Sequence, residues 1–109
     1  MTQVTYKHDR DRYYFKVEGH SDGARNEHNH DLVCCACSTL GFVLVNAVNE
    51  MEYPEVLIYD GKIPQMEVKF HTSNQRLIGV VESILWTFQS LAEQYPKNIQ
   101  LKMSKKGEK

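Results

Sequence analysis

The chain has 109 residues, of which 41% are hydrophobic and 25% charged, and a formal net charge of -1 at pH 7. This length suits one domain with one hydrophobic core. The near-neutral charge argues against a direct nucleic-acid binder, because neutralising phosphates requires a clustered basic surface. The N-terminal residues show no signal-peptide pattern, and no apolar run approaches the roughly 20 residues that span a bilayer. We therefore expect a cytoplasmic protein with no membrane partner.

We expect a single domain over residues 1–103, followed by a disordered basic tail over residues 104–109. The tail reads SKKGEK, and short charged termini are usually solvated. The cysteines stand at positions 34, 35 and 37, too close together for a disulfide framework and odd in number. They should therefore be reduced thiols, and we expect no cofactor.

The first elements along the chain are a hairpin and a long helix. Residues 3–7 and 13–18 alternate apolar and polar side chains, which predicts two strands joined by a turn over residues 8–12. The polar residues that follow Gly19 contain no hydrophobic pattern and are predicted to form a loop. Apolar residues then recur at three- and four-residue steps, which predicts a helix from Leu32 to about Glu50 with Asp31 as its N-cap.

The second half repeats this order and adds one strand. Residues 56–59 and 62–71 are predicted strands, joined by the two-residue turn that Asp60 and Gly61 favour. Ser73 or Asn74 can cap a second helix, which Pro96 stops, and residues 99–103 alternate as a short final strand. The order β-β-α-β-β-α-β predicts an α+β, two-layer sandwich with both helices on one face of a mostly antiparallel sheet. Its other face, expected to meet water, carries Tyr14, Lys16, Glu67 and Lys69.

Cys34 is the candidate nucleophile. With Asp31 as N-cap it is the third helical residue, where unpaired backbone N–H groups and the positive helix end favour a thiolate. His20 stands where a strand enters the loop, within plausible reach of the helix start, and Ser38 lies one turn after Cys34. Each residue also has an ordinary use: cysteine as a small buried hydrophobe, Asp31 as a cap, and Ser38 bonded back to the Cys34 carbonyl. We expect the other two cysteines to be packing residues.

The pattern Gly-His, a polar loop, then Asp-Leu-Val-Cys-x-x-x-Ser resembles the signature of the ribosome-processing cysteine proteases, the Prp or YsxB-like family. The order of the elements, the chain length and the ending Tyr-Pro-Lys-Asn-Ile are similar to that family as well. The resemblance implies a bacterial homodimer that removes the N-terminal extension of the large-subunit ribosomal protein numbered twenty-seven. It further implies cleavage after a phenylalanine-rich segment, so this peptide is the expected partner.

Carried over by residue, the resemblance makes Cys34 the nucleophile and His20 its base. It makes Asp31 and Ser38 supporting positions, and the third group that orients His20 stays open between these two and a histidine of the loop. The substrate loop contains Gly19, Ser21, Asp22 and Gly23. Ser21 replaces an expected alanine and His30 an expected glycine.

Three other functions fit parts of the pattern. Cys34-x-x-Cys37 has the spacing of a thiol–disulfide redox site. His20, His28, His30 and a cysteine are residue types that bind zinc, although their spacing is irregular. A ribosome-assembly factor without enzymatic activity would share only the fold.

Overall fold

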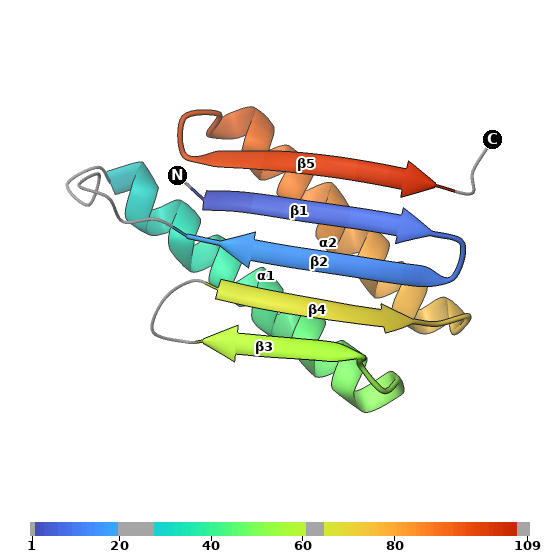
Figure 1. Ribbon diagram of the computed structural model, residues 1–109. Coiled ribbons are helices and arrows are strands. Elements are labelled where there is room, and N and C mark those ends of the chain that lie inside the picture. Colours follow the sequence, from blue (N-terminus) through green and yellow to red (C-terminus); the bar gives the residue numbers. More distant parts are fainter. Residues whose placement is uncertain (1, 20–27, 61–64, 107–109) are drawn as a thin grey trace.

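A computed structural model describes residues 2–19, 28–60 and 65–106, with backbone alone at residues 28–32, 59–60 and 105–106. The order of the elements is the predicted one (Figure 1). They are β1 (Thr2–Asp9), β2 (Arg12–Glu18), α1 (His28–Met51), β3 (Val56–Asp60), β4 (Gln65–His71), α2 (Gln75–Gln94) and β5 (Ile99–Lys106).

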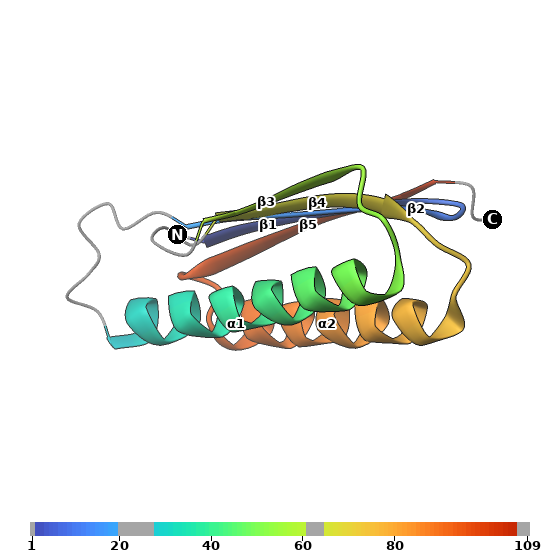
Figure 2. The ribbon, with the colours of Figure 1, turned by 90° about the horizontal axis from the view of Figure 1, so that it is seen from below.

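The strands form one sheet in the order β3-β4-β2-β1-β5. All neighbouring pairs are antiparallel except β1 with β5, which is parallel. Figure 2 shows both helices beneath the same face of this sheet, with the other face uncovered. The predicted α+β sandwich is therefore confirmed.

The core lies between the sheet and the helix layer. Alternate residues of the strands point toward the helices because successive strand side chains face opposite sides. The helix α2 contributes one stripe of buried apolar side chains to this core. The Asn74 side chain caps the helix by accepting a hydrogen bond from the Arg76 amide at 2.9 Å. Each large apolar side chain that is fully buried contributes about 1.5–3 kcal/mol to folding. The largest of these are Phe15, Phe70, Phe88, Leu44, Met66 and Leu77.

Both predicted hairpin turns need correction. The β1–β2 turn has only two residues, Arg10 and Asp11, because Asp9 pairs with Arg12; the sequence 8–12 is polar throughout and gave no sign of this. A two-residue turn at Asp60 and Gly61 is wrong, because Asp60 is the last residue of β3 and pairs with Gln65. The intervening residues 61–64 lie outside the described part of the chain.

The last strand is longer than its apolar alternation predicts. β5 extends to Lys106, which pairs with Asp9 of β1. Residues 104–106 are therefore part of the sheet rather than of a disordered tail, because parallel backbone pairing with β1 continues after the apolar pattern has ended. Residues 107–109 lie outside the described residues.

The helix α1 begins at His28, four residues before the predicted start, so Asp31 is not its N-cap. Its first residues are polar, so the helical spacing of apolar residues begins only after them. The sequence therefore predicted too late a start for the helix. Its segment Val33–Met51 has mean hydropathy 1.4 over 19 residues and is long and apolar enough to cross a membrane. The expectation that no apolar run approaches the length of a membrane span was therefore wrong. Core helices of soluble proteins meet the same criterion, and α1 buries Val33, Leu44 and Val48 in this domain.

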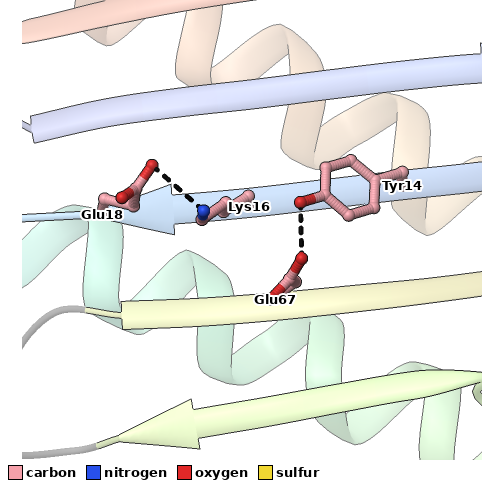
Figure 3. A network of polar contacts seen from close by, with 4 residues as sticks. All are labelled: Tyr14, Lys16, Glu18 and Glu67. Carbon is pink, nitrogen blue, oxygen red and sulfur yellow. Dashed lines mark hydrogen bonds and ion pairs between the residues drawn. The ribbon is translucent and has the colours of Figure 1, made fainter.

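On the uncovered face, β2 and β4 carry the predicted polar side chains (Figure 3), whereas β3 at the edge of the sheet exposes Val56 and Ile58. Tyr14 donates a hydrogen bond to Glu67 at 2.6 Å, and Lys16 forms an ion pair with Glu18 at 3.6 Å. Burial, and then the hydrogen bond to Glu67 and its charge, raise the pKa of Tyr14 to about 12. These side chains pair with one another along and across the strands, so this face is consistent with exposure to water.

Arg10 has a φ of 61°, a backbone conformation that suits glycine and is strained for a residue with a β-carbon. We expect Arg10→Gly to raise the free energy of unfolding by about 0.5–1 kcal/mol. The hydrogen bond that the Arg10 carbonyl accepts from the His8 ring at 2.6 Å would be kept. Urea unfolding followed by circular dichroism measures the change.

The matched control is Arg12→Gly, which removes the same charge from a strand position. It should lower stability, because glycine in a strand is unfavourable. Stabilisation by Arg12→Gly and not by Arg10→Gly would contradict this account of the turn.

Candidate active site

Cys34 lies where the helix layer meets the beginning of β1. Its side chain is half-buried, and its Sγ is 3.6 Å from the hydroxyl oxygen of Thr2. Thr2 is fully buried. Figure 1 shows the start of α1 beside the same end of the sheet, where β1 begins and β2 ends. The thiol is therefore packed against the sheet at the end where β1 begins.

The strand that precedes the predicted base in sequence ends at this end of the sheet. β2 ends at Glu18, which pairs with Gln3 of β1, and Gly19 is the next residue and is half-buried. His20, Ser21, Asp22 and Gly23 lie outside the described residues. The structure thus brings Gly19 and Cys34 to one end of the domain, although β2 and α1 are separated by the loop.

The sequence argument for a thiolate at the helix start is wrong. Because α1 begins at His28, the unpaired N–H groups of its first turn belong to residues 28–31, whereas Cys34 is its seventh residue. The effect of the helix dipole declines within the first turn. Asp31 is inside the helix, three residues before Cys34, and its side chain is outside the description. Any stabilisation of a thiolate must therefore come from side chains around the sulfur.

Ser38 is half-buried one turn after Cys34, on the same side of α1. One alternative for Ser38 was a hydrogen bond to the carbonyl four residues earlier. The neighbouring Thr39 makes a bond of this kind, since its hydroxyl donates to the Cys35 carbonyl at 2.9 Å. The structure therefore supports the predicted proximity of Ser38 and Cys34 along the helix.

The three cysteines occupy different environments and form no disulfide. Cys35 is exposed, because it lies on the side of α1 away from the buried stripe, so the expectation that it is a packing residue was wrong; Cys37 is fully buried in the core, as expected. Burial, followed by the influence of Cys34, raises the pKa of the Cys37 thiol to about 12. A redox pair requires a partner that ionises and exchanges readily, so the burial of Cys37 disfavours the Cys34-x-x-Cys37 redox alternative.

Among the described side chains, those of residues 2–19, 33–58 and 65–104, no three His, Cys, Asp or Glu are grouped so as to hold a metal ion. The zinc alternative uses the side chains of His20, His28 and His30, which are outside that description.

A hollow of about 590 Å³ lies elsewhere, on the uncovered face of the sheet. Its lining includes Lys7, Tyr14 and Glu67 and none of the cysteines. Tyr14 is already bonded to Glu67, and the Lys7 ammonium lies 5.5 Å from the centre of the Tyr14 ring. This hollow is thus separate from the thiol and on the opposite side of the sheet.

Comparison with known proteins decides the family. The family model of cysteine protease Prp matches residues 1–100. The chain belongs to the Prp family. The ribosomal processing cysteine protease Prp of Staphylococcus aureus (strain Mu50 / ATCC 700699) is 30% identical over 88 residues, which cover 78% of this chain and 80% of that protein.

Solved structures share the fold. SMU.848 from Streptococcus mutans superposes with a TM-score of 0.77 at 26% identity, over 97% of this chain and 99% of that one. The Prp protease of S. aureus in complex with a substrate peptide gives a TM-score of 0.74 at 22% identity, over 94% and 99%. Members of the Prp family are cysteine proteases, and the present chain is therefore a cysteine protease.

One contact at this site was missed in the sequence. Thr2 and Cys34 are 32 residues apart, and no motif connects them. The sequence feature that bears on this contact is the alternation along β1, which puts Thr2 on the same face as Val4 and Tyr6. That pattern shows burial toward the helices but not which helical residue Thr2 meets.

Because Cys37 is fully buried with a raised thiol pKa, we expect it to be dispensable for the Prp reaction. Cys37→Ala should leave peptide cleavage near the wild-type rate. In the native protein at about pH 8, a thiol reagent should label the exposed Cys35 and leave Cys37 unmodified until denaturant is added. Peptide mapping by mass spectrometry gives this measurement.

The control is Cys35→Ala, an equal truncation at an exposed position of the same helix. It too should preserve cleavage. Loss of cleavage in Cys37→Ala, with the fold intact by circular dichroism, would instead favour the redox alternative.

Proposed function

We propose that this protein is a ribosomal-processing endopeptidase in which Cys34 is the nucleophile and His20 the general base. The observation that carries the proposal is the position of the Cys34 sulfur at the end of the sheet where β2 leads through Gly19 directly to His20. Of the three thiols, Cys34 alone is both partly accessible and in contact with the sheet at that end. The family match over residues 1–100 supplies the reaction class.

In the proposed reaction, His20 accepts the proton of the Cys34 thiol, and the thiolate attacks the carbonyl carbon of the scissile peptide bond. The tetrahedral intermediate collapses as the protonated imidazole gives its proton to the leaving amine, and the new N-terminus departs. Water, deprotonated by His20, then attacks the thioester, releases the carboxylic acid and restores the thiol. Asp31, Ser38 or a histidine of the loop orients the imidazole.

We propose that the substrate is the N-terminal extension of the large-subunit ribosomal protein numbered twenty-seven, cut after its phenylalanine-rich segment. Two observations support a peptide substrate of ribosomal origin. The S. aureus relative is a ribosomal processing cysteine protease, and the S. aureus Prp structure holds a substrate peptide. We propose that the enzyme acts on this substrate in the bacterial cytoplasm, where cysteines stay reduced, with no direct contact to nucleic acid or membrane.

We further propose a homodimer formed through the helix layer. Large apolar side chains are exposed on the outer side of both helices: Phe42 is 51% and Val43 45% exposed on α1, and Trp86 is 59% exposed on α2. Exposed aromatic residues of this size are enriched at the centres of protein interfaces. A second copy would cover them and would explain why so much of α1 is apolar.

The first test is incubation of the purified protein with a peptide that copies the ribosomal extension and its cleavage site. The wild type should cut after the phenylalanine-rich segment. Cys34→Ala should lose all detectable cleavage because no nucleophile remains, and His20→Ala should fall by about 10²–10⁴-fold, the usual contribution of a general base. Mass spectrometry identifies the products and chromatography gives the rates.

Cys35→Ala is the matched control, since it truncates the adjacent thiol. A Cys34→Ala protein that cleaves at the wild-type rate would refute the assignment. Cleavage of a scrambled peptide as fast as the native one would refute the proposed substrate.

The second test concerns the dimer. Val43→Glu places a charge in the proposed apolar interface, where an unpaired buried charge is strongly unfavourable. We expect this variant to be monomeric by light scattering at concentrations where the wild type is dimeric. Ile58→Glu, at a 48% exposed apolar position of β3 outside the helix layer, should keep the dimer. A monomeric wild type, or a dimeric Val43→Glu protein, would contradict the proposed interface.

A further inference from the structure

The buried hydroxyl of Thr2 is in contact with the Cys34 sulfur. The Oγ1–Sγ distance is 3.6 Å, and Thr2 is 0% exposed. A hydroxyl removed from water is unfavourable unless it forms a hydrogen bond. No buried polar side-chain atom in the described part of the chain lacks a hydrogen-bond partner. For the Thr2 hydroxyl, the Cys34 sulfur is such a partner.

The backbone on which Thr2 is mounted is fixed on both sides. Its amide donates to the Asn98 carbonyl at 2.8 Å, and the residue pairs with Ile99 of β5. The next residue, Gln3, pairs with Glu18 of β2. The hydroxyl is therefore presented to α1 by a strand that has neighbours on both edges.

The Asn98 anchor is itself held in place. Asn98 is only 6% exposed, and its amide donates to the Tyr95 carbonyl at 2.9 Å. The end of α2, the start of β5 and the start of β1 are thus connected by consecutive backbone hydrogen bonds. Movement of the Thr2 backbone away from α1 would require breaking this connection.

The chemistry of the contact changes with the state of the sulfur. With a neutral thiol, either group can donate. A thiolate only accepts, so the hydroxyl must then be the donor, and hydrogen bonds to a charged group are stronger than those between neutral groups. The contact therefore restrains the direction of the sulfur, and it does so more strongly when the sulfur is charged.

We propose that Thr2 is a positioning residue for Cys34, whose hydroxyl donates to the thiolate and holds the sulfur at the end of the sheet. This inference rests on the proposed role of Cys34 as the nucleophile. It adds a residue on β1 to the proposed active site.

The test compares Thr2→Val, which replaces the hydroxyl by a methyl group of similar size, with Thr2→Ser, which keeps the hydroxyl. All variants carry Cys35→Ser so that iodoacetamide reports on Cys34, because Cys37 is buried. Thr5→Val on the same strand is the matched control, since Thr5 points to the opposite face. The alkylation rate at about neutral pH is measured by intact mass, and kcat and KM are measured on the ribosomal peptide.

We expect Thr2→Val to slow alkylation of Cys34 about tenfold and to lower kcat by a similar factor with little change in KM, as loss of one charge-assisted hydrogen bond implies. Thr2→Ser and Thr5→Val should react at rates close to that of the Cys35→Ser parent. Thr2→Ala, a second variant without the hydroxyl, should match Thr2→Val and provides the same comparison if the valine protein does not fold by circular dichroism.

Two results would overturn the inference: unchanged alkylation and kcat in a folded hydroxyl-free variant, or a Thr2→Ser protein as slow as Thr2→Val. The Cys34→Ala protein separates this failure from that of the proposed function. If Cys34→Ala is inactive and Thr2→Val is fully active, only the role of Thr2 is refuted. If Cys34→Ala cleaves normally, the proposed function is refuted, whatever the alkylation rates show.

Discussion

The site depends on how α1 packs against the sheet. Val33, Cys37, Leu44 and Val48 of this helix are buried, and their spacing places them on one side of it. Once this stripe is buried, the rotation of the helix is fixed. Cys34 is one residue after Val33, about 100° further around the helix, so it falls at the margin of the core. It is therefore neither sealed like Cys37 nor fully exposed like Cys35.

The same packing explains why the environment of the thiol differs from that of a helix start. The helix extends back to His28, which moves its unpaired amides away from Cys34. In their place the thiol meets a side chain of the sheet, presented by β1 where it lies between β2 and β5. A side-chain donor on a strand with two neighbours is a more rigid mount than a loop. The parallel pairing of β1 with β5 thus has a direct bearing on the chemistry, because it holds the residue that contacts the sulfur.

The sequence predicted most of the fold because each element carries a strong local signal. The alternation of Tyr13, Phe15 and Val17 and the apolar stripe of α2 were sufficient for their elements, and the observed cap, Asn74, is one of the two that the sequence allowed. The failures came where backbone pairing continued without an apolar pattern. Residues 104–106 extend β5 by pairing with β1, and Asp60 pairs with Gln65 although Asp-Gly favours a tight turn. Register is a property of two strands together, and one strand's sequence did not show it.

For the site, the sequence alone determined the family signature, the three adjacent thiols and the β-β-α-β-β-α-β order. Those features follow from residue identity and from periodicities that span only a few positions. The tertiary structure alone decided which thiol lies at the end of the sheet, that Cys35 is exposed, and that Thr2 meets Cys34. The physical reason is that contact between residues 32 positions apart depends on the rotation of α1 and the register of β1, which arise only when the whole core is packed.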